Sequence, residues 1–395
     1  MPKNTQDISY SDTGERARAL SNVQRIVIKV GTRLLTGVDG TSKAQRVYEL
    51  VEAIAGMRQH GLDIILVSSG AIGAGMGVLQ TPKRPRLLPQ LQSHAAVGQC
   101  RLMYLYETAC EQFGFHSAQI LLTAEDVQNR ERHLNVTSCL DALLSNGLLP
   151  VINENDSVSV DEIKFGDNDR LAALVAVMAR ADLTIMLTSV DGLHEIRNQQ
   201  LDRRISIVNR ITQRVRNLAG DTADRKYSVG GMATKIQAAE SVVKAGENVW
   251  IADGADFKVL PRILAGEDVG TLFTSTKPIR MRGRQRYLAF FADYKGDITV
   301  DQGAAQALTR RGRSLLPSGI TGLAGSFKRG DTVRIRNPEG NEIARGVTNY
   351  DADEVRQICG RQTSEISTIL HYEAYDTVVH RNYMVLTAGR DTDLS

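Results

Sequence analysis

The chain has 395 residues, of which 42% are hydrophobic and 24% charged, and its formal net charge is +3. This composition is typical of a soluble globular protein and excludes a disordered or fibrous chain. The length predicts two domains, and so small a net charge gives no reason to expect a polyanion as the partner of the whole molecule. The apolar runs fall far short of the roughly 20 residues that a membrane-spanning helix needs, so we expect no membrane partner.

The amino-terminal 22 residues are polar and contain no apolar run. We therefore expect a flexible extension there and no secretory signal. The four cysteines, Cys100, Cys110, Cys139 and Cys359, form no C-x-x-C pair. This pattern predicts free thiols in a reducing cytoplasm.

Between residues 26 and 254, short apolar runs alternate with longer amphipathic segments. The strand candidates are 26–30, 63–69, 118–123, 148–153, 183–189 and 249–253, and the helix candidates are 44–61, 132–147, 169–181 and 232–246. Because these strands are apolar throughout, helices should cover both faces of the sheet. The pattern predicts an α/β fold, an αβα sandwich with a mainly parallel central sheet.

Three loops beside these elements are typical of phosphate binding. In chain order they read KVGTRLLTG, which contains Lys29, VSSGAIGAGMG, which contains Ser69, and SVGGMATK, which contains Lys235. Exposed backbone amides and an ammonium group can face the same bound anion. The loops match neither G-x-x-x-x-G-K-[ST] nor G-x-G-x-x-G. Since ligands of such sheets bind beyond the carboxyl ends of the strands, we expect a phosphate site of another design at that edge.

An acidic stretch, VINENDSVSVDEIKFGDND, follows the fourth strand candidate at residues 151–169. It holds six acidic side chains and three asparagines in nineteen positions. One interpretation is a solvated, charged loop. The other is a half-buried hairpin, because Val158, Val160, Ile163 and Phe165 stand at near-alternate positions. The hairpin would place an organised anionic surface beside the phosphate loops.

The composition changes near residue 277. From 277 to 345 there are fourteen lysines and arginines and six acids, an excess of eight positive charges. The strand candidates here are short and bounded by turns: YLAFF, GDITVD, GDTVRIRN and EIARGVT. Such strands, separated by glycines, predict a small, mostly β domain.

Seven blocks carry a family resemblance: KVGTRLLTG, VSSGAIGAG, AAVGQ, QILLT, INENDSVSVDEIKFGDND, VGGMATK and IADG. In this order and spacing, over residues 23–275, they resemble the glutamate 5-kinases of the amino-acid kinase superfamily. GDITVDQGAAQAL, RGRSLLPSGI, GSFKRGD and IARGVTNYDADE resemble the PUA domain. The chain departs from the family pattern at LTS, where LTD is usual, at the missing DPR after GLH, and at SVGGM, where GTGGM is usual.

The resemblance implies five segments. These are a flexible extension (1–22), the amino-acid kinase catalytic domain (23–276), a linker (277–292), the PUA domain (293–380) and a carboxyl-terminal tail (381–395). It also implies a cytoplasmic enzyme that moves the γ-phosphoryl group of ATP onto the side-chain carboxylate of L-glutamate, the first step of proline biosynthesis. Mg²⁺ should accompany the nucleotide, held mainly by phosphate oxygens and water, with no protein ligand assigned.

The resemblance and the loop chemistry together assign candidate site residues. Lys29 and Lys235 are the expected catalytic cations. The ATP-binding set is Lys29, Gly31, Thr32, Thr188, Ser189, Gly230, Gly231, Met232 and Lys235, and the glutamate-binding set is Ser69, Gly70, Asp156, Asp167, Asn168 and Asp169. The acids are expected to face the substrate ammonium, because a desolvated ammonium needs opposing carboxylates. For Asp169 a plain helix-capping role is an equal expectation.

Several alternatives stay open. N-acetylglutamate kinase or aspartokinase activity is the enzymatic rival, although an acetylated substrate has no ammonium and would leave the acidic stretch unexplained. A protein that binds RNA through the PUA domain and has a decayed kinase domain is the rival from another class. RNA contact by an active enzyme is a further hypothesis, and the resemblance implies a homodimer or homotetramer.

Overall fold

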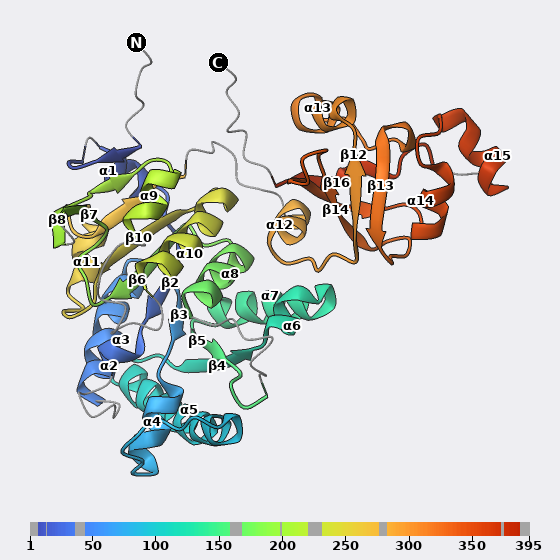
Figure 1. Ribbon diagram of the computed structural model, residues 1–395. Coiled ribbons are helices and arrows are strands. Elements are labelled where there is room, and N and C mark those ends of the chain that lie inside the picture. The colour runs from blue at the N-terminus through green and yellow to red at the C-terminus, as the bar shows by residue number, and fades with distance from the viewer. Residues whose placement is uncertain are drawn as a thin grey trace. The chain divides into compact units, whose positions relative to one another are not determined.

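The computed structural model describes residues 7–12, 14–35, 44–158, 168–197, 200–219, 231–275, 283–372 and 375–387. The chain divides into two compact units (Figure 1): the first comprises Met1–Val127 and Glu131–Arg280, and the second comprises Gln128–Arg130 and Met281–Ser395. Within the described ranges, no helix has the length and apolar character needed to cross a membrane. All four cysteines are free, as predicted.

The first unit is built on one large sheet. Its described strands lie in the order β1-β9-β11-β10-β6-β2-β3-β5-β4, and all neighbouring pairs are parallel except β1 with β9 and β10 with β11. The strands are β1 (Ile8–Ser9), β2 (Arg25–Val30), β3 (Asp63–Ser68), β4 (Ser117–Leu122), β5 (Leu149–Glu154), β6 (Leu183–Thr188), β9 (Ile207–Val208), β10 (Asn248–Asp253) and β11 (Thr271–Phe273). The six strands predicted between residues 26 and 254 are therefore confirmed.

Helices cover both faces of this sheet, as Figure 1 shows. They are α1 (Glu15–Leu20), α2 (Thr32–Leu35), α3 (Ala44–Gln59), α4 (Ala71–Val78), α5 (Leu88–Glu111), α6 (Ala124–Gln128), α7 (Arg130–Ser145), α8 (Asn168–Ala179), α9 (Gln213–Leu218), α10 (Met232–Ala245) and α11 (Val259–Leu264). Residues of α3, α5 and α11 share one buried core with Ile26 and Ile28 of β2. Helix α8 packs on the other face and against α10. The predicted αβα sandwich is confirmed.

The register of the central strands brings their carboxyl ends together. Val30 at the end of β2 pairs with Ser68 at the end of β3 and with Leu187 near the end of β6. The loops that follow these strands therefore start side by side at one edge. Gly70, which precedes α4, has a φ of 108°, a left-handed conformation that favours glycine, and this lets the chain turn directly from β3 into α4.

Glycines in the second loop serve helix packing. Gly75 and Gly98 lie where α4 crosses α5: a Cβ on Gly75 would lie 1.9 Å from the His94 carbonyl oxygen, and one on Gly98 would lie 1.7 Å from the Ala71 carbonyl oxygen. The backbones of the two helices are thus in direct contact. The expectation that this glycine-rich run offers exposed amides is wrong beyond Gly70, because Gly73 and Gly75 are buried inside α4.

The described part of the amino-terminal segment, residues 7–12 and 14–22, is not the flexible extension that its polarity predicts. Strand β1 pairs with β9, and Arg16 of α1 is fully buried. The Arg16 guanidinium donates to the carbonyl oxygens of Glu267 and Val269 at 2.8 and 2.9 Å and pairs with Asp268 at 2.7 Å. One arginine with several acceptors compensates for the missing apolar side chains, which is why hydropathy alone misses this segment.

The second unit contains a five-stranded sheet in the order β13-β12-β14-β15-β16. Its elements are α12 (Gly283–Phe290), β12 (Gly296–Val300), α13 (Gln302–Arg311), β13 (Ile320–Gly325), β14 (Thr332–Arg336), β15 (Glu342–Thr348), α14 (Ala352–Ile358), α15 (Ile366–Leu370) and β16 (Val379–Leu386), with short 3₁₀ turns at Pro317–Gly319 and Thr363–Glu365. This mostly β architecture confirms the predicted class, and the predicted strands GDITVD, GDTVRIRN and EIARGVT are present.

Three expectations for this unit need correction. YLAFF is not a strand, because most of it lies in helix α12, whose Leu288 packs with Ala292 and Val385. The predicted linker, 277–292, therefore includes a packed helix. The predicted tail, 381–395, includes most of β16, which pairs with β15 as far as Leu386. The composition of a short aromatic run predicts a strand, but its packing against other residues determines whether it forms a helix.

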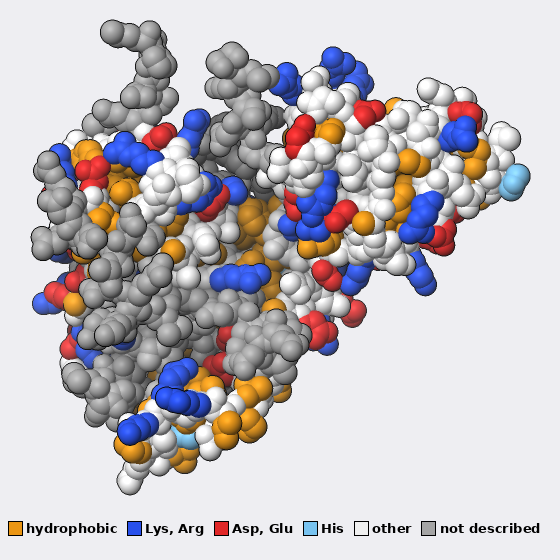
Figure 2. Space-filling view, in the orientation of Figure 1, with side chains coloured by type: hydrophobic (Ala, Val, Ile, Leu, Met, Phe, Trp, Pro, Cys, Tyr) orange, Lys and Arg blue, Asp and Glu red, His pale blue; other side chains and the backbone are white. Residues whose placement is uncertain are grey.

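The basic excess of the second unit is partly neutralised within it. Arg334 and Arg336 both pair with Asp297, at 2.6 and 3.3 Å, and Arg345 pairs with Glu342 at 2.8 Å. On the face seen in Figure 2, the Lys and Arg side chains of this unit are interspersed with acidic ones.

Candidate active site

Two lysines and one aspartate form a buried ionic cluster beyond the carboxyl end of β2. The Lys29 ammonium of β2 lies 2.6 Å from one carboxylate oxygen of Asp169, and the Lys235 ammonium of α10 lies 2.9 Å from the other. The Thr234 hydroxyl donates to the same carboxylate at 3.2 Å. Lysines 206 positions apart in the sequence are thus held on either side of one acid. We call Lys29, Asp169 and Lys235 the ionic cluster.

Burial makes this cluster electrostatically strong. Asp169 is fully buried and both lysines are more than nine-tenths buried. Burial alone would raise the pKa of the Asp169 carboxyl, but the charges and hydrogen bonds of Lys29 and Lys235 outweigh it and hold that pKa below its ordinary value. With Asp169 ionised, the three groups carry one net positive charge, which suits a site for a polyanion.

Asp169 does not have the helix-capping role, and its expected contact with the substrate stays a prediction. It is the second residue of α8 rather than its cap, and its carboxylate oxygens contact lysines. The reason is helix geometry. Asn168 and Asp169 are neighbours in the first turn, so their side chains diverge by about 100° and enter different surroundings.

Asn168 enters a chain of neutral hydrogen bonds. Its Nδ2, which carries two protons, shares them among three acceptors: the Ser69 hydroxyl at 2.6 Å, the Ser68 carbonyl at 3.1 Å and Asn153 Oδ1 at 3.1 Å. Asn153 Nδ2 in turn donates to Gln99 Oε1 of α5 at 2.9 Å. We call Gln99, Asn153, Asn168 and Ser69 the amide chain. Asn153 lies near the end of β5 and Ser69 directly after β3, and Gln99 and Asn153 are buried.

Sequence reasoning found one end of the amide chain and missed the other. Ser69 and Asn168 were expected from the family resemblance, and the structure brings them into direct contact. Gln99 and Asn153 were not assigned a role, and Tyr106, whose hydroxyl lies 2.8 Å from Ser68 Oγ, was not considered. The sequence signal for Gln99 is the block AAVGQ, in which this polar residue directly follows Gly98 within an otherwise apolar run.

Other expected residues lie around the two clusters. An ideal Cβ on Gly31 would lie 3.9 Å from the Lys29 ammonium, and one on Gly70 would lie 3.6 Å from Thr32 Cγ2. Gly231 precedes α10, whose first residue is Met232 and which carries Lys235. The structure thus gathers Gly31, Thr32, Gly70, Gly231 and Met232 on the loops that lead to the lysines and to Ser69.

Thr188 and Ser189 lie at the end of β6, where Thr188 pairs in register with Asp253 of β10. Ser189 is exposed. The segment that lacks the DPR block forms a short hairpin of β7 (His194–Arg197) and β8 (Gln200–Arg204). Among the described residues, no hydrogen bond of the Thr188 or Ser189 side chain is seen.

Part of the acidic stretch lies outside the described residues. Strand β5 continues through Glu154, which is buried, and Asp156 follows it half-buried. Asp167, Gly230 and most of the predicted hairpin, including Val160, Ile163 and Phe165, are not described. The hairpin stays a prediction.

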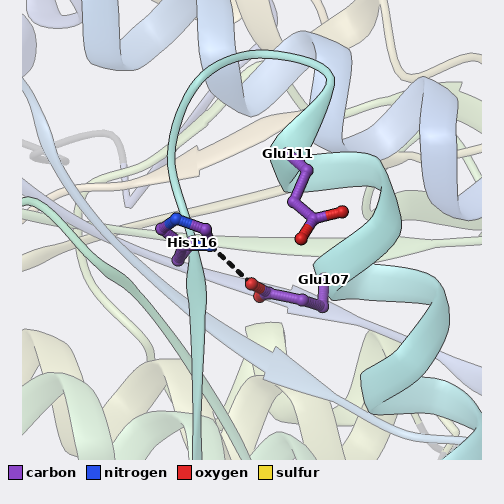
Figure 3. Close-up of side chains that lie close together, drawn as sticks. All are labelled: Glu107, Glu111 and His116. Atoms are coloured by element: carbon purple, nitrogen blue, oxygen red, sulfur yellow. Dashed lines mark hydrogen bonds and ion pairs between the residues drawn. The ribbon is translucent and has the colours of Figure 1, made fainter.

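A second group of acids lies at the opposite, amino-terminal edge of the sheet. Ligand atoms of Glu107, Glu111 and His116 lie within 4.8 Å of one another (Figure 3). The Glu107 carboxylate is already engaged by His116 Nδ1 at 2.6 Å and by the amide and hydroxyl of Ser117 at 2.8 and 2.6 Å. Although burial opposes it, these hydrogen bonds lower the pKa of Glu107. We assign Glu107 the structural role of joining the end of α5 to the start of β4.

Comparison with known proteins agrees with this geometry. Residues 24–253 match the model of the amino acid kinase family, and residues 296–370 match that of the PUA domain. The glutamate 5-kinase of Trichlorobacter lovleyi is 44% identical over 374 residues, which cover 94% of this chain and 99% of that protein. The glutamate 5-kinase of Citrifermentans bemidjiense is 44% identical over 373 residues, covering 94% and 100%.

The glutamate 5-kinase of Caldanaerobacter subterraneus is 46% identical over 369 residues, covering 92% of this chain and 98% of that protein. Similarity at this level covers more than nine-tenths of this chain. The chain therefore belongs to the amino acid kinase family, in its glutamate 5-kinase branch.

Proposed function

We propose that this protein uses ATP to phosphorylate the γ-carboxylate of L-glutamate, and that the two buried clusters divide the work. The ionic cluster receives the nucleotide phosphates and the transferring phosphoryl group, and the amide chain with Asp156 receives the amino-acid end of glutamate. The observation that carries the proposal is the ionic cluster itself, because two buried ammonium groups fixed by one carboxylate form a preorganised site for phosphoryl charge.

The chemistry requires little beyond charge and position. A glutamate carboxylate has a reference pKa near 4.3, so it is already a nucleophile at neutral pH and needs no general base. Phosphoryl transfer then depends on alignment of the two substrates and on neutralisation of the phosphoryl oxygens. Lys29 and Lys235 supply that neutralisation without reorganising, since Asp169 already holds both.

Asp169 acts through the lysines. Its carboxylate keeps two like charges close together in a buried place, where alone they would repel each other and lose hydration. Mg²⁺ would accompany the nucleotide and be held mainly by phosphate oxygens, since the Asp169 oxygens are engaged by lysines. Nucleotide contacts of Gly31, Thr32, Thr188, Ser189, Gly230, Gly231 and Met232 are part of the proposal.

The substrate side accounts for the choice of glutamate. The free amino acid carries an α-carboxylate and an ammonium, which need a donor and an acceptor. Ser69, Gly70 and Asn168 would supply contacts of both kinds, and the half-buried Asp156 and the expected Asp167 would face the ammonium. An acetylated substrate would lose the charged contact to Asp156.

The test is an acyl-phosphate assay with hydroxylamine, run with ATP, Mg²⁺ and one of three acceptors: L-glutamate, N-acetylglutamate or L-aspartate. We expect hydroxamate with glutamate. Activity with only one of the other two acceptors would reject the substrate assignment. A wild type no more active than Lys29→Ala and Lys235→Ala would reject the enzyme assignment and favour a decayed kinase.

Assembly as a dimer or tetramer stays a prediction, which light scattering coupled to size exclusion can check. Arg334, Arg336 and Arg345 give RNA contact through the second unit no support, because each is paired with an acid. A cytoplasmic location stays a prediction.

A further inference from the structure

The direction of every hydrogen bond in the amide chain is fixed by the backbone at two points. The Glu154 amide can only donate, and it donates to Asn153 Oδ1 at 2.9 Å. The Ser68 carbonyl can only accept, and it accepts from Asn168 Nδ2 at 3.1 Å. These two backbone groups determine which end of each amide is oxygen and which is nitrogen, so the assignment does not depend on hydrogen positions.

These two fixed points also determine the atom assignments at both ends of the amide chain, Gln99 and Ser69. Asn153 must present Nδ2 to Gln99, so Gln99 must present Oε1, and these two atoms lie 2.9 Å apart. Asn168 must present Nδ2 to Asn153 and Ser69, so its Oδ1 points away from both of them. The Ser69 oxygen accepts this bond at 2.6 Å, and its own hydroxyl proton is left to donate elsewhere.

Helix α5 also sets the backbone beside Ser69. Tyr106, two turns after Gln99, contacts Ser68 Oγ at 2.8 Å, and that oxygen lies 3.3 Å from the Ser69 carbonyl. Burial raises the pKa of Tyr106, which keeps it a neutral phenol. Gln99 directly follows Gly98, whose backbone touches α4, so the position of Gln99 is set by a helix contact without flexible side chains.

We infer that Gln99 is a positioning residue for the amino-acid substrate: through Asn153 it orients Asn168 and Ser69, so that Ser69 offers a donor to the α-carboxylate and Asn168 offers an acceptor to the ammonium. This inference rests on the proposed function and deepens it, because it identifies what distinguishes the two ends of a zwitterion. A residue of α5 that touches no substrate thus contributes to specificity.

The principal test compares Gln99→Met with Gln99→Glu. Methionine has nearly the same shape, but its thioether sulfur is only a weak acceptor. Asn153 therefore loses a strong partner in a buried place, and we expect the KM for glutamate to rise about tenfold. The KM for ATP should change by less than about twofold. Glutamate at position 99 keeps an acceptor in either protonation state, and should recover most of the lost affinity. Gln90→Met, at an exposed position near the start of α5, is the matched control.

A double-mutant cycle tests the route. In an Asn153→Ala background, Gln99→Met should have little further effect on the KM for glutamate, because the proposed path is already broken. Independent, additive effects would overturn the inference. If Gln99→Met does not fold, the smaller Gln99→Leu removes the same acceptor.

The outcomes separate this inference from the function it rests on. An unchanged KM for glutamate in Gln99→Met, with an active wild type, overturns the inference alone. Equal rises in both KM values with a lower melting temperature would show a merely structural role and also overturn it. A wild type with no glutamate-dependent turnover overturns the proposed function and this inference together.

Discussion

The ionic cluster and the amide chain meet at two consecutive residues and follow opposite designs. Asp169 joins two charges that lie far apart in sequence, whereas Asn168 joins a series of neutral groups whose direction is set by the backbone. In the first, the strength of interaction comes from charge in a buried place. In the amide chain, the specificity comes from which atom of each pair donates and which accepts. Phosphoryl chemistry needs the former, and recognition of an amino acid needs the latter.

The largest expected effect is the loss of stability when Asp169, at the centre of the ionic cluster, loses its charge. Asp169→Asn leaves two buried ammonium groups without their counter-charge, and we expect a loss of about 3–5 kcal/mol in the free energy of unfolding. Urea denaturation measures it. The exposed Asp141→Asn, which loses only a surface pair with Arg25, should cost less than about 1 kcal/mol. Equal costs for the two variants would contradict the central role of Asp169.

The same variant has a defined pH dependence. The folded-state pKa of Asp169 is lowered, so its contribution is fully present above the unfolded-state pKa of about 3.9 and is lost as the pH falls through the folded-state value. The stability gap between wild type and Asp169→Asn should therefore be constant near neutral pH and narrow below about pH 4. A gap that widens on acidification would show that another group dominates.

The next effect separates catalytic from surface lysines. Lys235→Ala removes one preorganised charge, and we expect kcat to fall by about a hundredfold or more, equivalent to about 3 kcal/mol of barrier. The control is Lys244→Ala. Lys244 lies on the same helix, is half-exposed, and pairs its ammonium with Glu240. This control should leave kcat within about twofold. Similar losses in both variants would point to damage of α10 rather than of the cluster.

A steric change in α5 should disturb the amide chain and leave the ionic cluster in place. Gly98→Ala would place a methyl group 1.7 Å from the Ala71 carbonyl and force α5 away from α4. We expect a loss of about 1–3 kcal/mol in stability and a raised KM for glutamate. Gly56→Ala in α3 has no atom within 4 Å of the added methyl group and should stabilise by about 0.5–1 kcal/mol. Thermal and urea denaturation check both, and a harmless Gly98→Ala would refute the close packing.

The smallest expected effect concerns Asp156, the half-buried acid that follows β5. Asp156→Ala should raise the KM for glutamate about tenfold, because a charged contact to the ammonium is lost, while the KM for ATP stays nearly constant. Initial-rate kinetics with each substrate varied in turn give both values, with Asp141→Ala as the exposed control. Intact affinity for glutamate would remove Asp156 from the site.

The sequence predicts the framework well and the connections between its parts poorly. Continuous apolar runs identify every central strand, and Lys29 and Lys235 stand out because each follows or accompanies glycines at a loop. The pairing through Asp169 could not be read from the sequence, since it depends on β2, α8 and α10 meeting at one point. The role of Gln99 escaped for the same reason, because its partner lies 54 positions away.

The amino-terminal segment and α12 show a different limit. Arg16 stabilises α1 through carbonyl acceptors that no residue pattern reveals, and YLAFF is as suitable for a strand as for a helix. In both cases the deciding contacts come from distant segments. Local composition therefore gives the correct result where burial is uniform and the wrong one where a single long-range contact determines the conformation.

The first turn of α8 has a consequence for engineering. Asn168 and Asp169 are consecutive residues of one helix. Under the proposed function, the separation between phosphoryl donor and acceptor would therefore be set by that helix and not by the surrounding loops. Loop exchange among related kinases should then alter which acceptor is taken while transfer itself persists, whereas inserting one residue ahead of Asp169 should abolish transfer for every acceptor.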